Sequence, residues 1–115
     1  RNPTKITLFI MIVAITSTGN SLESFIDPRF GRCSYFVFYN TETKESVFQP
    51  NPFKDNDEGV GVDVVEWITT FSCSKIVSGQ FGMKIKPLLD ENRIQLILVN
   101  DPELTIRQII NLLSQ

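Results

Sequence analysis

Five short stretches of the chain are dominated by apolar and β-branched residues, the composition that strands favour. The first, residues 8–15, is apolar almost without interruption, so we expect it to be buried on both faces as the central strand of a sheet. The second and third stretches are separated only by a short polar connection, which predicts a hairpin. The predicted strands are residues 8–15, 33–39, 44–49, 75–78 and 93–99.

A different spacing in residues 59–71 predicts the first helix. Apolar side chains recur there at intervals of three and four, the period of a helix with one face on a sheet. Asp57 and Glu58 precede this stripe and suit the N-cap and the positive end of the helix dipole. The stripe consists of Val60, Val64, Trp67, Ile68 and Phe71.

Two further helices are expected in the second half of the chain. The turn at residues 79–82 leads into a helix that ends near Glu91, and Pro87 predicts a kink or a late start in it. The last helix is predicted to start with Asp101 as its cap and Pro102 at its first position. Its predicted buried face is Ile106, Ile109, Ile110 and Leu113.

In chain order these elements read β-β-β-α-β-α-β-α. A hairpin followed by helical crossovers predicts an α/β fold, with a mixed sheet covered by helices. A chain of 115 residues is long enough to bury one continuous core, so a single domain over residues 1–115 is expected.

Composition narrows the classes of function. The net charge of -2 lacks the basic excess that nucleic-acid binding uses, and the absence of histidine excludes histidine triads and histidine-based zinc sites. Residues 6–15 are much shorter than the roughly 20 apolar residues that cross a bilayer, so no membrane association is expected. Two cysteines, Cys33 and Cys73, fit a reducing cytoplasm better than a disulfide scaffold. The first residue, Arg1, indicates an incomplete or processed N-terminus.

The densest chemistry lies in residues 27–38, at the mouth of the second predicted strand. Arg29 and Arg32 flank Gly31, and their planar guanidinium groups can hold an anion between them. The thiolate of Cys33 is a ligand type that iron and other soft metals prefer. This stretch is therefore the candidate functional site, with Arg32 as its best candidate binding residue.

Each of these residues also has a structural interpretation. Arg29 is equally suited to an ion pair with Asp27 or Glu23 that closes the loop. Cys33 is equally consistent with a buried residue at the start of a packed strand, because unpaired cysteine is among the most buried residue types. For Cys73, a place in the core or on the surface is favoured over a ligand role.

The helix predicted at residues 59–71 begins with two glycines, Gly59 and Gly61. If this helix start lies beside the arginines, its free backbone N–H groups add a second anion-binding element. The glycine spacing matches neither a phosphate-binding loop nor a dinucleotide fingerprint. Close approach of the helix, or closure of the loop before it, is the alternative role.

Several short motifs occur together along the chain. Their combination resembles the dinitrogenase iron-molybdenum cofactor biosynthesis family, which includes NifX-like domains and the end of the NifB protein. The resemblance covers nearly the whole chain, and its specific part is RFGR followed by YF; where some members have a histidine before the Phe-Gly pair, this chain has Arg29. The motifs are TGNSLES at 18–24, DPRFGR at 27–32, YF at 35–36, NP at 51–52, GVGV at 59–62 and SGQFG at 78–82.

This resemblance implies a three-layer fold similar to ribonuclease H, with a five-stranded mixed sheet in the order 3-2-1-4-5 and helices on both faces. It also implies a non-enzymatic protein that binds or carries an iron-sulfur or molybdenum-containing cluster, or its precursor, with metallocofactor assembly proteins as partners. Cys33 is the predicted metal ligand. The predicted cofactor-binding residues are Arg29, Phe30, Gly31, Arg32, Cys33, Gly59 and Gly61.

Two other functions can be weighed against this one. A regulatory domain that binds a small anion or a protein partner without metal would use the same arginines. A nuclease is suggested by fold analogy alone, and two-metal phosphoryl transfer needs clustered carboxylates, which the predicted central strand lacks. A monomer or a weak dimer is expected in either of the first two cases.

Overall fold

Five strands and three helices form within residues 11–114, the part of the chain that the computed structural model describes. Their kinds and their order match the sequence-based prediction. In chain order they are β1 (Ile12–Ser17), β2 (Tyr35–Asn40), β3 (Ser46–Pro50), α1 (Val60–Thr69), β4 (Cys73–Ser78), α2 (Ile85–Glu91), β5 (Gln95–Leu98) and α3 (Ile106–Leu113).

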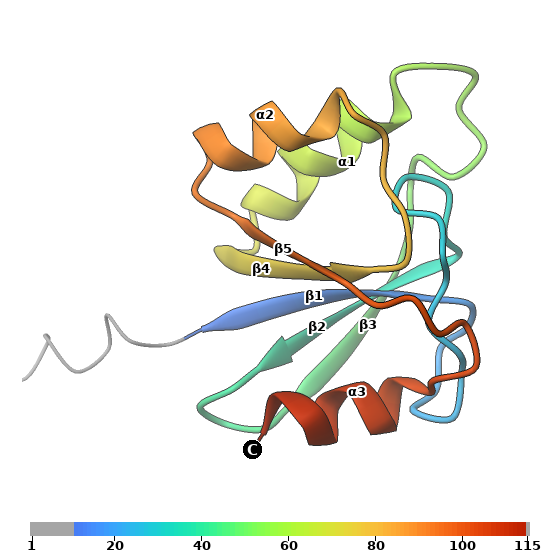
Figure 1. The fold of residues 1–115 in the computed structure, drawn as a ribbon, viewed down its shortest axis with the longest axis vertical. Helices are drawn as coiled ribbons and strands as arrows, with labels where there is room; N and C mark the ends of the chain where they lie inside the picture. Colours follow the sequence, from blue (N-terminus) through green and yellow to red (C-terminus); the bar gives the residue numbers. More distant parts are fainter. Residues whose placement is uncertain (1–10, 115) are drawn as a thin grey trace, which may run out of the picture.

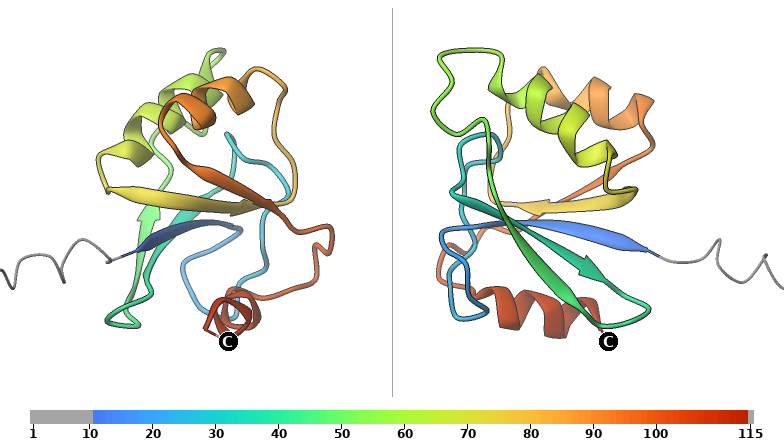
Figure 2. Two further views of the ribbon diagram at one scale, coloured as in Figure 1. Left: turned by 60° about the vertical axis from the view of Figure 1, so that its left-hand side comes forward. Right: turned by 180° about the vertical axis from the view of Figure 1, so that it is seen from behind.

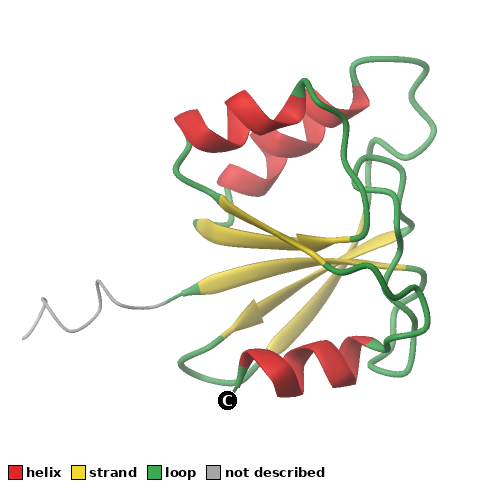
Figure 3. Cartoon of the chain, viewed as in Figure 1, coloured by secondary structure: helices red, strands yellow, loops and turns green. Residues whose placement is uncertain are grey.

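The strands form one mixed sheet in the order β3-β2-β1-β4-β5 (Figure 1 and Figure 3). The central strand, β1, pairs antiparallel with β2 and parallel with β4. The hairpin partner β3 extends one side, and β5 joins β4 in parallel on the other. The predicted order 3-2-1-4-5 is therefore confirmed, and the carboxyl ends of β1 and β4 meet at the same edge of the sheet.

Helices cover both faces of the sheet: α1 and α2 lie on one face and α3 on the other (Figure 1 and Figure 2). The alternation of side chains along each strand supplies the two cores. In β1, Ala14 packs on the α1 side, whereas Val13 and Ile15 pack on the α3 side. In β4, Ile76 and Val77 divide in the same way. The three-layer α/β fold is thus confirmed.

The core under α1 is rich in aromatic rings. Phe38 stacks on Phe71 with ring centroids 4.1 Å apart. Trp67 packs edge-on against Phe36 and Phe38, with centroids 5.7 Å apart in both pairs. Trp67 and Phe71 therefore belong to the core, as their helical spacing predicts. None of the helices within residues 11–114 combines the length and the hydropathy needed to cross a bilayer.

The start of α1 differs from the prediction. Its N-cap is Gly59, which has a φ of 72°, and no side chain caps the helix. The prediction that Asp57 or Glu58 provides the cap is therefore wrong. A left-handed backbone favours glycine at this point, because a Cβ makes that conformation costly.

The start of α3 also lies later than predicted. Asp101 accepts a hydrogen bond from the Glu103 N–H in a short turn but does not cap the helix. The N-cap is Thr105, whose side chain accepts from the Gln108 N–H while the Gln108 side chain accepts from the Thr105 N–H. This capping box satisfies two N–H groups at once and outweighs the signal from the earlier Asp-Pro pair.

Several element ends also differ: β2 starts at Tyr35 rather than at residue 33, and β4 starts at Cys73 rather than at residue 75. α2 starts at Ile85, so Pro87 lies in its first turn, where N–H groups have no helical acceptor and proline is tolerated. Of the two predicted effects of Pro87, a kink or a late start of the helix, the structure shows the late start. The first predicted strand begins at residue 8, and residues 8–10 lie outside the described part of the chain. Its described part ends at Ser17 rather than at residue 15.

Candidate functional site

Three segments gather at the edge of the sheet where the parallel strands β1 and β4 end (Figure 1 and Figure 2). They are residues 27–33, here called the arginine loop, residues 79–84 after β4, and the start of α1. Arg29 forms an isolated parallel β-bridge with Gln80, which joins the first two segments. In open α/β sheets ligands bind outside the carboxyl ends of strands, so this edge is the expected place for a site.

Two glycines allow these segments to approach closely. A Cβ at Gly79 would lie 2.6 Å from the Pro28 Cα, so only glycine fits against the backbone there. A Cβ at Gly31 would lie 3.1 Å from the Val60 Cγ1 and 3.6 Å from the Gly61 amide nitrogen. The arginine loop therefore rests on the first turn of α1. The backbone N–H groups of this helix start lie beside the arginines, as the predicted second anion-binding element requires.

An open groove of about 860 Å³ lies between these segments. Two of its apolar side chains reach solvent, since Met83 is 90% exposed and Val62 is 41% exposed. Of the described residues that line it, the charged ones are Arg29, Arg32 and Lys84, and all three are cations. Other apolar lining residues are Phe30, Val60, Phe81 and Ile85.

A buried carboxylate holds Arg29. Asp27 Oδ1 accepts from the backbone N–H and from Nε of Arg29 at 2.9 and 3.0 Å, and Oδ2 accepts from Nη2 at 2.9 Å. The Asp27 side chain is 2% exposed, whereas that of Arg29 is 58% exposed. The hydrogen bond and the charge of Asp27 raise the pKa of Arg29. The predicted alternative, an ion pair that closes the loop, is thus present with Asp27, while Glu23 pairs with Arg107.

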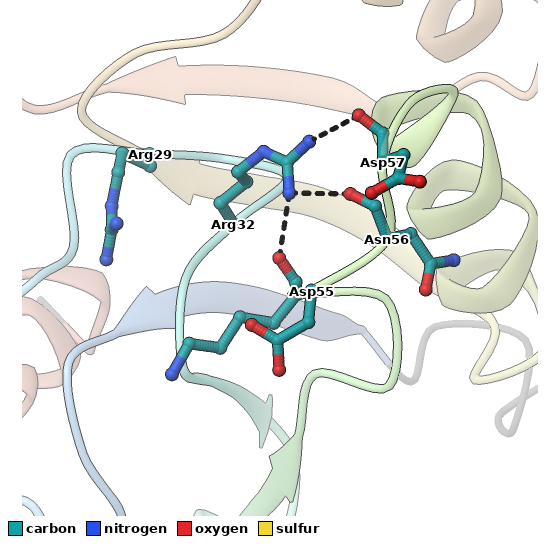
Figure 4. Close-up of a pocket in the computed structure, with 6 residues that line it drawn as sticks. Arg29, Arg32, Asp55, Asn56 and Asp57 are labelled. Atoms are coloured by element: carbon teal, nitrogen blue, oxygen red, sulfur yellow. Dashed lines mark hydrogen bonds between the residues drawn. The ribbon is translucent and has the colours of Figure 1, made fainter.

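Arg32 is held by backbone carbonyls instead. Its Nη1 donates to the carbonyls of Lys54 and Asn56 at 2.9 and 2.8 Å, and its Nη2 donates to that of Asp57 at 3.1 Å. Figure 4 shows this guanidinium directed into the loop before α1, with Arg29 lying apart from it. The two arginines and this loop line a second hollow of about 390 Å³.

Cys33 ends the arginine loop, but its side chain lies in the core under α1. It is 0% exposed, and its Sγ lies 3.6 Å from the Phe30 carbonyl oxygen. Burial, followed by the negative charge of Asp27, raises the pKa of this thiol. Burial likewise raises the pKa of Cys73 to about 12. This geometry favours the core interpretation of both cysteines, and metal ligation by Cys33 stays a prediction.

The structure brings most of the predicted binding residues together. Cys33 does not line the groove. Within residues 11–114, no three side chains of His, Cys, Asp or Glu are grouped so that they could hold a metal ion. The predicted residues that do line the groove are Arg29, Phe30, Gly31, Arg32, Gly59 and Gly61.

Sequence reasoning missed part of the site. Lys84 and Met83 line the groove from the segment after β4, and the motif there was the available signal. Asn51 was also missed, although its side chain donates to the carbonyls of Gly31 and Cys33 at 2.8 and 2.9 Å. This buried amide fixes the end of the arginine loop, and the Asn-Pro motif was its only trace in the sequence.

Comparison with solved structures supports the same fold. The apo form of the orange protein from Desulfovibrio gigas superposes with a TM-score of 0.82 and 24% identity, covering 89% of this chain and 85% of that one. A putative NifB protein from Thermotoga gives a TM-score of 0.76 and 25% identity, with 90% and 87% covered. A putative dinitrogenase from Methanocaldococcus jannaschii gives 0.57 and 17%, with 90% of each chain covered.

Comparison by sequence gives the family. A search of the curated proteins found no match. The family model described as dinitrogenase iron-molybdenum cofactor matches residues 11–115, which is nearly the whole chain. The chain therefore belongs to the dinitrogenase iron-molybdenum cofactor family, which links it to the biosynthesis of that cofactor.

Proposed function

We propose that this chain is a non-enzymatic carrier for an anionic iron-sulfur or molybdenum-containing cluster, or for a precursor of one. The observation that carries the proposal is the groove beside the arginine loop, whose charged lining residues are Arg29, Arg32 and Lys84. The whole chain has a net charge of -2, whereas the charged side chains that line this groove are cations, with the charge of Arg29 partly offset by Asp27. Family membership supplies the class of cargo.

The groove suits an anion with a soft, weakly hydrated surface. Apolar walls such as Phe81 and Met83 cannot replace the water that a hard oxyanion loses on entry, so phosphate or molybdate would bind there at a high desolvation cost. A sulfide-faced cluster holds its water less tightly and contacts apolar side chains with a smaller penalty. The combination of cations and apolar walls therefore favours metal-sulfur cargo.

Charge and backbone donors would hold this cargo. Arg29 and Lys84 supply positive charge, and the N–H groups in the first turn of α1 supply hydrogen bonds at the positive end of the helix dipole. A Cβ at Gly31 would lie 3.6 Å from the Gly61 amide nitrogen, so glycine keeps a side chain away from this amide. The Cys33 sulfur would have to leave the core before it could bind, so the proposal does not depend on it.

A carrier must also release its cargo to other proteins. The groove is open at the side of Met83, whose side chain is almost fully exposed. Cargo in such a groove stays accessible to a second protein. We therefore propose proteins of metallocofactor assembly as the partners, acting in the cytoplasm.

Anaerobic reconstitution tests the proposal. The purified protein is incubated with iron, sulfide and molybdate, freed of unbound material by gel filtration, and examined by metal analysis and visible absorption. We expect stoichiometric metal and a sulfide-to-metal charge-transfer band. Protein that retains no stoichiometric metal would contradict the carrier function. Binding of inorganic phosphate in that case would support the regulatory alternative.

Matched variants connect any bound metal with the groove. Arg29→Lys keeps a cation beside Asp27 but loses the planar fork, and we expect it to lower affinity by roughly tenfold. The same change in Arg107, an exposed arginine on α3, should have no effect. Cys33→Ser and Cys73→Ser compare two buried thiols, and a loss of metal in the first alone would show that the Cys33 thiol reaches the cargo.

A further inference from the structure

The two arginines of the groove are held in opposite ways. Arg29 bonds to a side chain, the buried carboxylate of Asp27, and its Nη1 makes no hydrogen bond within residues 11–114. Arg32 bonds to main-chain carbonyls, and both of its Nη atoms are engaged. One edge of Arg29 is therefore available to an anion, whereas Arg32 is directed into its own chain (Figure 4).

Arg32 holds the loop at residues 54–58, directly before α1. All five of these residues are exposed, so burial does not fix the loop. Within residues 11–114, this loop makes three hydrogen bonds with Arg32 and one more, from the Asn56 N–H to the nearby Phe53 carbonyl at 3.1 Å. Among the described residues, Arg32 thus supplies every hydrogen bond between this loop and a distant part of the chain.

Negative charges repel one another within the loop, and the Arg32 guanidinium offsets this repulsion. Asp55, Asp57 and Glu58 place three negative charges on a short exposed segment, with Lys54 as its only cation. Three carbonyl oxygens also surround this guanidinium, two of them bonded to Nη1 and one to Nη2. A positive charge there favours the closed loop, because like charges on a short segment otherwise favour an extended one.

The loop also adjoins the start of α1. It leads into Gly59, the left-handed N-cap, and the first turn of α1 rests against Gly31. Gly31 directly precedes Arg32 in the chain. The backbone of the arginine loop therefore contacts the helix start, while the Arg32 side chain holds the segment that enters it.

We propose that Arg32 is a positioning residue, which holds loop 54–58 and the start of α1 in place, and that Arg29 is the arginine that contacts the cargo. The part concerning cargo rests on the proposed function. The part concerning the loop does not, because it can be measured in the free protein. Lysine cannot replace Arg32 in this role, since two Nη atoms in a planar fork reach three carbonyls whereas an ammonium group is a single point.

Backbone ¹⁵N relaxation of the free protein tests the positioning role. In the wild type we expect order parameters of about 0.85 for the amides of residues 54–58, and in Arg32→Lys values below about 0.6. Arg29→Lys and Arg107→Lys are matched controls, and both should keep the loop rigid. A rigid loop in Arg32→Lys would overturn the proposal.

Titration of the same proteins with tetrathiomolybdate, a diamagnetic sulfide-faced anion, tests the division of roles. We expect Arg29→Lys to lower affinity roughly tenfold with a rigid loop, and Arg32→Lys to lower it comparably with a mobile loop. Wild-type affinity in either variant would contradict the role assigned to that arginine. If the wild type binds neither this anion nor a reconstituted cluster, the proposed function fails together with the contact role of Arg29. The order parameters then still decide the role of Arg32.

Discussion

The N-termini of α1 and α3 differ in how they are capped. In α3, Thr105 and Gln108 form a capping box that satisfies N–H groups of the first turn. In α1, the N-cap is Gly59 and no side chain caps the helix, while its first turn lines the groove. A side-chain cap contributes about 1 kcal/mol to stability. The helix that borders the groove thus lacks this contribution, and its N–H groups remain available to a ligand.

The two layers of the core also differ in the residues that they contain. The layer under α3 is mainly aliphatic, with Phe48 packed against it, whereas the layer under α1 and α2 holds the aromatic cluster and both cysteines. The groove therefore borders the layer that contains the aromatic rings and the thiols. Both thiols nevertheless face the interior of that layer, so the surface chemistry of the groove depends on cations and backbone amides.

The largest expected effect concerns these thiols at alkaline pH. Burial raises the pKa of Cys73 to about 12 and also raises the pKa of Cys33 above its usual value of 9.0. Above pH 9.0 the unfolded chain loses these protons while the folded protein keeps them, so the free energy of unfolding falls as the pH rises. Below pH 9.0 the protonated thiols make their full contribution to the free energy of unfolding. About 1 kcal/mol per thiol should be lost over the next pH unit.

Denaturant unfolding at several pH values measures this loss. The control is the double variant Cys33→Ala with Cys73→Ala, which has a lower stability from the cavities but no thiol to titrate. Its stability should fall less steeply with pH than that of the wild type. If the free energy of unfolding fell equally with pH in the two proteins, the buried thiols would not contribute to the pH dependence, and this difference between the two layers would be absent.

The elements of the fold could be predicted because their signals are local. The apolar, β-branched run of β1 and the helical stripe of α1 each identify an element from local sequence, whereas the strand order came from the family resemblance. The local Asp101 signal did not locate the start of α3, because the capping box of Thr105 and Gln108 sets it together with tertiary contacts. The Ile106 N–H donates to the Ser24 carbonyl at 2.9 Å, and Phe25 bridges to Thr105.

Part of the groove lining was predictable from the sequence, but the hydrogen-bond partners of its arginines were not all predictable. Arg29 bonds to a carboxylate two positions away, which the sequence displays. Arg32 bonds to carbonyls more than twenty positions away, and every residue has a carbonyl, so residue type carries no signal for this contact. The burial of Cys33 likewise depends on the turn that Asn51 fixes through main-chain oxygens.

A change at the capped helix should affect stability alone. Thr105→Ala removes the capping box of α3, and we expect the free energy of unfolding to fall by about 1 kcal/mol. Because α3 lies on the opposite face of the sheet from the groove, affinity for tetrathiomolybdate should not change. Unfolding curves and an NMR titration of the same sample measure both quantities. A fall in affinity would show that the two helix starts are coupled, against the division drawn above.

The smallest expected change in stability comes with a clear change in binding. In Gly31→Ala the new Cβ lies 3.1 Å from the Val60 Cγ1 and 3.6 Å from the Gly61 amide nitrogen, so it covers a donor at the uncapped start of α1. We expect a stability loss of about 0.5 kcal/mol and a severalfold lower affinity for tetrathiomolybdate. Gly82→Ala is the matched control, because Gly82 lines the same groove and a Cβ there meets nothing within 4 Å. Equal affinities in the two variants would mean that the N–H groups of α1 do not contribute to binding, and that the absence of a cap on this helix has no functional role.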